Sequence, residues 1–247
     1  MKLIKHIPNL LTCLNLTSGF IAIIMAFQPR LLPFAPYLIL IAAFFDFTDG
    51  FSARLLKAYS ELGKQLDSLA DMVSFGVAPG VIAFQMMQIS LSPAAQFNIY
   101  AMMATYIIPA FIPIFSALRL AKFNIDDRQT SSFIGLPTPA SAVLICSLTL
   151  ILFNTESNWV QNFILNPGIL TLIILADSFI MVSNLPMFSL KFKSIAFNKN
   201  KPQYIFIGIS VALLFCFKII AIPIIILVFI VESIVIYSFS KKKESSL

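Results

Sequence analysis

Four of the seven aspartates in this 247-residue chain lie within one stretch of 26 residues, DFTDGFSARLLKAYSELGKQLDSLAD at 46–71. A helix turns about 100° per residue, so Asp46 and Asp49 share one face of a helix. The same spacing places Asp67 and Asp71 on one face of a following helix. If the two helices form a hairpin around LKAYSEL, all four carboxylates converge at one end of it.

Four carboxylates this close together need a bound cation or shared protons to offset their repulsion. Every available ligand atom is a carboxylate oxygen, with no His or Cys nearby. Such a donor set favours the hard ions Mg²⁺ and Mn²⁺. Two divalent ions about 4 Å apart are the usual arrangement for displacement at phosphorus. The stretch therefore predicts a two-metal site for phosphoryl chemistry.

Small residues accompany the aspartates on the same helix faces. Gly50 and Ala53 follow Asp49, and Gly63 precedes Asp67. Their short side chains leave room for a bulky ligand against the helix backbone, and Arg54 at the edge can reach a phosphate. Two other interpretations stay open on these residues alone. One is a tight helix–helix contact, and the other is the proton or cation pathway of a transporter.

The composition shows which solvent these helices occupy. Apolar residues make up 59% of the chain and charged residues 11%, whereas a soluble domain carries about 25% charged residues. The mean hydropathy is +0.91. We therefore expect an all-α, polytopic membrane protein with a single catalytic membrane domain over 1–247. The three cysteines lie in apolar runs without metal-ligand spacing and are expected to act as small hydrophobic residues.

Stop signals divide the chain into about eight predicted transmembrane helices. Residues 1–9 are expected to form a juxtamembrane segment, residues 10–186 a six-helix core, and residues 204–239 a C-terminal helix pair. The break at FKIIAIP is the weakest, because it fits either a tight turn or a kink in one helix. The predicted helices are 10–27, 34–57, 63–90, 97–121, 137–153, 168–186, 204–219 and 221–239.

The positions of Lys and Arg favour eight spans with both termini in the cytoplasm. With that arrangement 15 of the 17 basic residues face the cytoplasm, and only Arg30 and Lys218 do not. Cytoplasmic loops are enriched in Lys and Arg. Seven spans would leave the terminal KKK outside, whereas six stay possible if the last pair is re-entrant. The net charge of +6 is explained by orientation and by anionic lipids, so no nucleic-acid partner is expected.

The aspartate stretch also carries a family signature. It fits D-x2-D-G-x2-A-R-x8-G-x3-D-x3-D without departure and so resembles the CDP-alcohol phosphotransferase family. Further segments are similar to its bacterial and archaeal serine-using members, the CDP-diacylglycerol–serine O-phosphatidyltransferases. These segments are PNLLTCLNLTSG, LDSLADMVSFGVAPG, LRLAKFN, GLPTPA and MVSNLPMFSLK. The resemblance covers residues 8 to about 191, although Asn184 and Met187 depart from the expected pattern.

The resemblance implies a reaction between CDP-diacylglycerol and L-serine that gives phosphatidylserine and CMP. It implies two Mg²⁺ or Mn²⁺ ions, held by Asp46, Asp49 and Asp67. Asp71 would contribute a ligand oxygen or act as general base. The nucleotide would contact Asp49 and four further residues of the signature, namely Gly50, Ala53, Arg54 and Gly63. It also implies a homodimer among membrane lipids, located in the inner (cytoplasmic) membrane with the active site facing the cytoplasm.

Two alternatives to this function stay open. One keeps the chemistry and changes the acceptor to glycerol 3-phosphate, inositol or another polyol, and the other is a metal-binding transporter.

Several polar residues outside the signature are candidates for contacts with the site. Thr12 and Asn15 lie about one turn apart and are expected either to hydrogen-bond the active-site network or to satisfy a helix contact. Arg119 and Lys122 can receive a phosphate or the serine carboxylate, or can serve as rim charges. Asp177 is an acid in an apolar run without an evident partner, and its role is unassigned.

Overall fold

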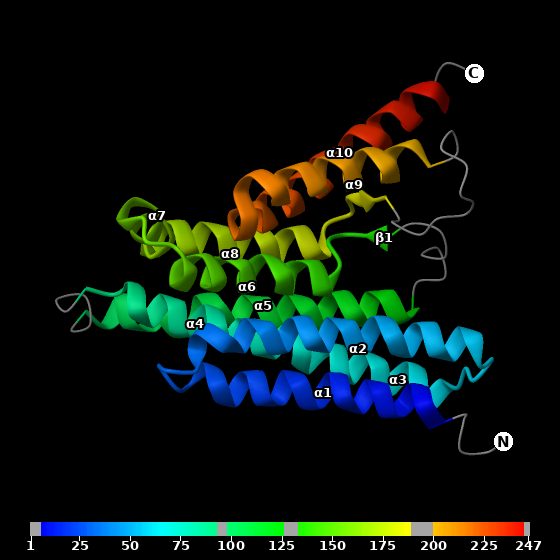
Figure 1. Cartoon of the computed structure of the whole chain (residues 1–247), viewed down its shortest axis with the longest axis horizontal. Coiled ribbons are helices and arrows are strands. Elements are labelled where there is room, and N and C mark those ends of the chain that lie inside the picture. The colour runs from blue at the N-terminus through cyan, green and yellow to red at the C-terminus, as the bar shows by residue number, and fades with distance from the viewer. Residues whose placement is uncertain (1–5, 93–97, 126–132, 189–199, 245–247) are drawn as a thin grey trace.

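The computed structural model describes residues 6–92, 98–125, 133–188 and 200–244, with the backbone alone at 133 and 239–244. Its helices lie side by side along the long axis of the molecule (Figure 1). Two short strands pair antiparallel, with Phe133 opposite Met187 and Ile134 opposite Pro186. The elements in chain order are α1 (Ile7–Ala26), η2 (Leu32–Phe34), α2 (Ala35–Leu55), α3 (Glu61–Asp71), η3 (Met72–Val77), α4 (Ala78–Ser90), α5 (Ile99–Ile125), β1 (Phe133–Ile134), α6 (Thr138–Asn154), α7 (Asn158–Ile164), α8 (Pro167–Val182), β2 (Pro186–Met187), α9 (Lys201–Phe217), η6 (Lys218–Ile220) and α10 (Ala221–Glu244).

The predicted helical membrane architecture is confirmed. Within the described residues, five helical segments are long and apolar enough to cross a membrane, and a sixth arises if α7 and α8 count as one bent span. Each of the eight predicted helices corresponds to a helical segment. The additional short helix α7 was not predicted, and it meets α8 at 57°. The span count of eight and the cytoplasmic position of the termini stay predictions.

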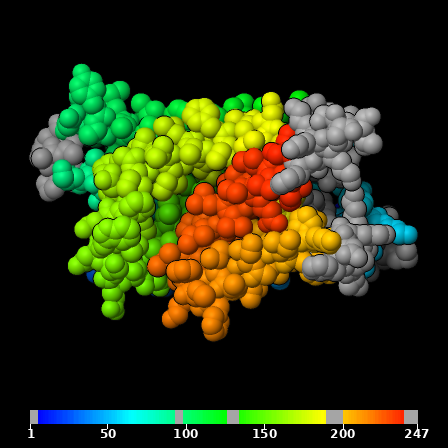
Figure 2. All heavy atoms as spheres, turned by 90° about the horizontal axis from the view of Figure 1, so that it is seen from above, coloured from blue at the N-terminus to red at the C-terminus, as the bar shows by residue number. Residues whose placement is uncertain are grey.

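The C-terminal break is a turn between two helices. Lys218 has a positive φ of 50°, and the rings of Phe206 in α9 and Phe229 in α10 lie 5.7 Å apart. A continuous helix would separate residues 23 positions apart by about 35 Å, at 1.5 Å per residue. Figure 2 shows the orange and red atoms of α9 and α10 lying together beside the yellow-green atoms of α7 and α8. The kinked-helix alternative is therefore wrong.

Several helix ends assigned to the cytoplasm gather at one end of the molecule. In Figure 1 the start of α1, the α2–α3 turn, the end of α5 and the end of α10 all lie at the right. The α1–α2 and α6–α7 connections, the end of α4 and the start of α5 lie at the opposite end. The fold thus places the signature stretch and the ends of α5 and α10 on the same side.

The α2–α3 turn has two local causes. Lys57 adopts a positive φ of 49°, which ends α2 after Leu55 instead of at the predicted residue 57. Ser60 then caps α3, because its Oγ accepts a 3.0 Å hydrogen bond from the backbone N–H of Gly63. Helix N-caps of this kind stabilise the first turn by about 1 kcal/mol. As a result α3 begins at Glu61, two residues before the prediction.

Close backbone contacts hold α3 and η3 against their neighbours. A Cβ added to Gly19 would lie 2.3 Å from Ser74 Oγ, and one added to Gly76 would lie 3.0 Å from the Ser116 Cβ. Ser74 also donates a 3.0 Å hydrogen bond to the backbone oxygen of Asn15. The π-helical turn at 72–77 therefore packs tightly between α1 and α5. This packing fixes the height and rotation of the preceding residue, Asp71.

Candidate active site

Three of the four aspartates meet where α2 and α3 face each other. Asp46 and Asp49 come from the last turns of α2, and Asp67 comes from α3. Each offers a carboxylate oxygen, and these three atoms lie within 4.8 Å of one another. Asp49 is 5% exposed, whereas Asp46 and Asp67 are half-buried. The predicted convergence of these carboxylates is confirmed.

The fourth aspartate, Asp71, is buried one turn further along α3. Its Oδ1 accepts a 3.1 Å hydrogen bond from Nδ2 of Asn15 in α1. Its carboxylate interacts electrostatically with Asp46, Asp67 and Asp49, but its oxygens are not part of the close group of three. Asp71 thus belongs to the cluster while standing apart from the three that could share an ion.

Helix α1 supplies a second contact to the acidic cluster. Thr12 Oγ1 donates a 2.6 Å hydrogen bond to Asp49 Oδ2 and lies 3.0 Å from the Pro8 carbonyl oxygen. Thr12 and Asn15 are both buried, so a contact of each with the aspartates is now established. Direct contact of either residue with substrate stays a prediction.

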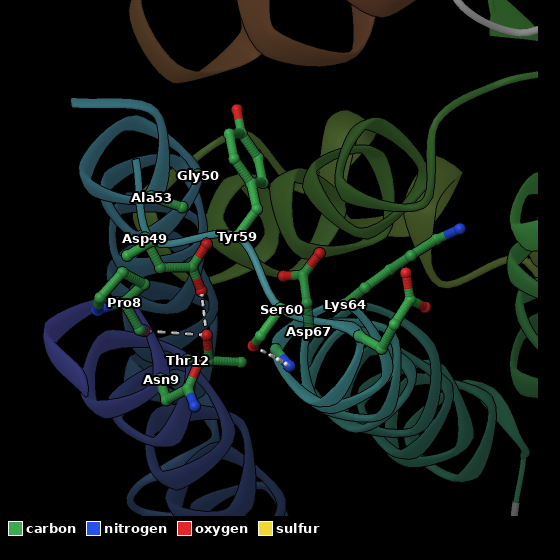
Figure 3. Close-up of a pocket in the computed structure, with 13 residues that line it drawn as sticks. Pro8, Asn9, Thr12, Asp49, Gly50, Ala53, Tyr59, Ser60, Lys64 and Asp67 are labelled. Carbon is green, nitrogen blue, oxygen red and sulfur yellow. Dashed lines mark hydrogen bonds between the residues drawn. The ribbon is translucent and has the colours of Figure 1, made fainter. Parts of the chain in front are cut away.

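A pocket of about 530 Å³ opens beside these carboxylates (Figure 3). Figure 3 shows it between the amino-terminal turns of α1, the last turns of α2 and the first turns of α3. Asp49 and Asp67 form part of its wall. The full lining is Pro8, Asn9, Thr12, Asp49, Gly50, Ala53, Ala58, Tyr59, Ser60, Glu61, Gly63, Lys64 and Asp67.

The small residues of the signature form part of that wall. Gly50, Ala53 and Gly63 all line the pocket, and a Cβ added to Gly50 would meet no atom within 4 Å. The expected space is therefore present at Gly50, whereas a Cβ on Gly63 would lie 3.0 Å from Asn9 Oδ1 and Ser60 Oγ. Arg54 is not part of the wall: its Nε donates a 3.0 Å hydrogen bond to the Gly50 carbonyl oxygen. Its contact with a nucleotide stays a prediction.

Sequence analysis missed the pocket residues contributed by the turn and by the start of α1. Tyr59, Ser60 and Lys64 line the pocket from the turn and α3, and Asn9 lines it from α1. Lys64 is exposed, and its Nζ lies 3.5 Å from the Asn124 carbonyl oxygen. The sequence did contain a signal for Lys64, because this residue directly follows the signature residue Gly63. A cation next to Gly63 is expected at the edge of the same pocket.

The two basic candidates on α5 differ in their surroundings. Arg119 is buried, and its Nη1 lies 3.5 Å from Thr138 Oγ1 at the start of α6. Asp71 is the carboxylate whose charge acts on it. Lys122 is exposed, as a rim charge would be.

Asp177 on α8, which had no evident partner in the sequence, does have one in the structure. Ser141 Oγ donates a 2.5 Å hydrogen bond to its Oδ2.

The acidic cluster fits a divalent ion. Three carboxylate oxygens from two helices lie close enough to share one ion, and Mg²⁺ and Mn²⁺ prefer such ligands. Within the described part of the chain, Asp67 Oδ1 is buried and has no hydrogen-bond partner, as expected of a free ligand atom. The donor set is therefore suited to a hard metal ion.

Comparison with known proteins assigns the chain to a family. The model of the family described as CDP-alcohol phosphatidyltransferase matches residues 5–180. A CDP-diacylglycerol–serine O-phosphatidyltransferase of Bacillus subtilis is 32% identical over 189 residues, which are 73% of this chain and 89% of that protein. The enzyme of the same name from Helicobacter pylori is 35% identical over 56% of this chain and 54% of its own length.

An archaeal relative has a related name. The archaetidylserine synthase of Methanothermobacter thermautotrophicus is 34% identical over 152 residues, which are 61% of this chain and 60% of that protein. The matched region of this chain contains the aspartate signature, the pocket and the helices α1 to α6. The chain belongs to the CDP-alcohol phosphatidyltransferase family.

Proposed function

We propose that this membrane protein transfers the phosphatidyl group of CDP-diacylglycerol to the hydroxyl of L-serine, giving phosphatidylserine and CMP. The observation that carries the proposal is the meeting of the Asp46, Asp49 and Asp67 carboxylates beside a pocket of about 530 Å³. The serine acceptor is supported by the names of the relatives from Bacillus subtilis and Helicobacter pylori.

The pocket suits the nucleotide part of the lipid substrate. Its wall combines open space beside the backbone of Gly50 with the ring of Tyr59 and the ammonium group of Lys64. An open backbone edge and an aromatic ring give a nucleoside surfaces to pack against. A lysine at the same edge gives the diphosphate a cation. The acyl chains would lie in the lipid around the helices.

Asp46, Asp49 and Asp67 would hold one or two divalent ions. When bound, the ions supply positive charge that neutralises the diphosphate and stabilises CMP as the leaving group. Thr12 keeps Asp49 oriented through its 2.6 Å hydrogen bond. The three aspartates, with Thr12 orienting Asp49, would therefore set the position at which the diphosphate is held.

Asp71 is the proposed general base. It lies one turn from Asp67 and is held by Asn15. In the reaction the serine O–H bond breaks and the proton passes to Asp71, while a bond forms between the serine oxygen and the phosphorus that carries the lipid. The bond from that phosphorus to the bridging diphosphate oxygen breaks, and CMP leaves with the electron pair. Arg54 at the mouth of the site is proposed to meet the diphosphate.

The proposal includes a location and an assembly state. The ends that carry the signature would face the cytoplasm at the inner membrane, since the Lys and Arg residues concentrate there. A homodimer is proposed from the resemblance to the family alone.

A panel of acceptors tests this function. Purified protein in detergent would receive CDP-diacylglycerol, Mn²⁺ or Mg²⁺, and in turn serine, inositol or glycerol 3-phosphate, with CMP as the readout. We expect CMP release with serine and little with the others. CMP release with inositol or glycerol 3-phosphate but not with serine would overturn the proposed acceptor and leave the proposed chemistry in place. The absence of release with every acceptor, from folded protein, would overturn the enzyme function in favour of a metal-binding transporter.

A further inference from the structure

Two buried side chains of opposite charge lie on helices that pack against each other, without forming an ion pair. Arg119 belongs to α5 and Asp177 to α8. Arg119 is 7% exposed and Asp177 is 2% exposed. Among the described residues, neither has a charged partner within 4.0 Å. Charged groups within membrane helices are rare and usually functional, so both residues need an explanation.

Arg119 has two weak contacts and spare hydrogen-bonding capacity. Its Nη1 lies 3.5 Å from the hydroxyl of Thr138, the first residue of α6, and its guanidinium carbon lies 5.9 Å from the ring centre of Phe123. Its Nε is buried and has no hydrogen-bond partner among the described residues. A guanidinium offers five N–H donors in a planar fork that matches a carboxylate. Arg119 therefore presents unused donors suited to an anion of this shape.

Asp177 is incompletely paired in the same way. Its Oδ2 accepts a hydrogen bond from Ser141, whereas its Oδ1 is buried without a partner. Among the described residues, the Oγ of the next residue, Ser178, is also buried and unpartnered. A buried carboxylate with one free oxygen can accept hydrogen bonds from a small cation with several N–H donors, such as an ammonium group.

The first turn of α6 connects the two charges. Thr138 contacts Arg119 and Ser141 contacts Asp177. Residues three apart share one face of a helix, with Cβ atoms about 5–6 Å apart. The two charges therefore flank a single helical turn.

The segment before α6 fixes this arrangement. Gly135 has a φ of +75°, and a Cβ on it would lie 2.1 Å from the Met181 carbonyl oxygen. The backbone N–H of Leu136 donates a 3.2 Å hydrogen bond to the Ile180 carbonyl oxygen. These contacts anchor the start of α6 to the end of α8. The anchoring holds Ser141 beside Asp177 and leaves Thr138 facing Arg119.

Leaving opposite charges buried and separate is costly, because each loses its hydration without gaining an ion pair. A ligand that carries one anionic and one cationic group would pair with both. An α-amino acid has these two groups on one carbon. Asp71 is the proposed general base, and its charge acts on Arg119. A ligand held by Arg119 would therefore lie on the same side as the base.

We propose that Arg119 binds the α-carboxylate and Asp177 the α-ammonium group of the acceptor amino acid, with its hydroxyl directed towards Asp71. This inference rests on the proposed function and deepens it, since it assigns the residues that select an amino acid over a polyol. Thr138, Ser141 and Ser178 line the same site and complete its hydrogen bonds.

Equilibrium binding of labelled serine tests the site without turnover. The full chain in detergent would be measured without CDP-diacylglycerol, as wild type and as the variants Asp177→Asn and Arg119→Gln. Each variant should bind serine about tenfold or more weakly, since each loses a charge-assisted hydrogen bond. Matched controls are Glu232→Gln, an acid on α10, and Arg30→Gln at the opposite end of the molecule. Both controls should bind serine as the wild type does.

Two half-analogues separate binding from a merely structural role. 3-Hydroxypropionate keeps the carboxylate and lacks the ammonium group, whereas ethanolamine keeps the ammonium group and lacks the carboxylate. Asp177→Asn should weaken serine and ethanolamine but leave the inhibition constant of 3-hydroxypropionate unchanged. Arg119→Gln should weaken serine and 3-hydroxypropionate but not ethanolamine.

The outcomes distinguish this inference from the proposed function. If wild type makes phosphatidylserine and both variants bind serine like the controls, the amino-acid site is overturned and the function stands. Equal weakening of serine and both half-analogues by each variant would indicate a structural role and also overturn it. A wild-type protein that releases no CMP with any acceptor would overturn the proposed function itself.

Discussion

Thr12 of α1 donates a 2.6 Å hydrogen bond to the carboxylate of Asp49 in α2, across 37 positions of sequence. Both side chains are buried, and both line the pocket. The bond orients the Asp49 carboxylate, one oxygen of which lies within 4.8 Å of carboxylate oxygens of Asp46 and Asp67. Helix α1 therefore contributes to the acidic site and also packs against the helices that carry it.

Removing this hydrogen bond should weaken metal binding. Thr12→Val keeps the shape of the side chain and loses the donor, so Asp49 is left less well oriented. Hydrogen bonds to charged groups contribute about 1.5–3 kcal/mol, so the affinity for Mn²⁺ should fall about tenfold or more, as measured by calorimetry. The control is Thr17→Val on the same helix, whose hydroxyl bonds only the Cys13 carbonyl oxygen. Equal affinities of the two variants would contradict the orienting role of Thr12.

Neutralising one of the three clustered aspartates should abolish metal-dependent activity. Asp67→Asn replaces a ligand with a neutral amide of the same size, and we expect CMP release to fall roughly a hundredfold or more, since several kcal/mol of charge stabilisation are lost. Chelation of the wild type by EDTA should give the same loss, restored by adding Mn²⁺ or Mg²⁺. Glu156→Gln, in the α6–α7 connection, should behave as wild type. Full activity of chelated wild-type protein would rule out the metal.

Gly19 should be intolerant of any side chain. A Cβ there would lie 2.3 Å from Ser74 Oγ and 2.7 Å from the Ser74 Cα, so α1 must move away from η3. Gly19→Ala should lower the free energy of unfolding by about 1–3 kcal/mol, as overpacking does, and should reduce activity by displacing Asn15. Thermal unfolding in detergent measures the first effect. Gly208→Ala, where nothing lies within 4 Å of the added Cβ, should be as stable as wild type; a similar loss in both would contradict the close contact.

Gly50 should show the opposite behaviour, with stability kept and substrate binding lost. A Cβ at Gly50 meets no atom within 4 Å, yet this residue lines the pocket. Gly50→Val should therefore unfold at nearly the wild-type temperature but raise the KM for CDP-diacylglycerol about tenfold, a loss of about 1.4 kcal/mol. Gly208→Val, equally unhindered on α9, is the matched control. An unchanged KM in Gly50→Val would place the nucleotide elsewhere.

Much of the fold follows from local sequence patterns. The apolar runs and their stop signals predict the helices to within a few residues, because length and hydropathy are properties of each segment alone. The aspartate cluster was also predictable, since helical spacing places Asp46 with Asp49 and a hairpin brings Asp67 to them. The exceptions include the short helix α7, which was not predicted. They also include the end of α2 and the start of α3, which depend on the positive φ of Lys57 and the cap at Ser60.

Contacts between distant segments could not be predicted in this way. Asp177 lacked an evident partner because Ser141 lies 36 positions away on another helix. The pocket residues Asn9 and Lys64 likewise have no pattern of their own, and only the docking of α1 against α3 brings them to one wall. The α9–α10 turn was left open because the segment FKIIAIP fits a turn as well as a kink, and only the contact between the two helices decides between them.

The proposed transfer is tested most directly by measuring both products of one reaction. Purified wild-type and Asp71→Asn protein would receive CDP-diacylglycerol, labelled serine and Mn²⁺, and CMP and labelled phosphatidylserine would be quantified together, with CDP binding measured in parallel. The account predicts equal amounts of the two products from the wild type. It predicts neither product from Asp71→Asn, which should still bind CDP. Wild-type CMP release without labelled phosphatidylserine, or full activity of Asp71→Asn, would contradict it.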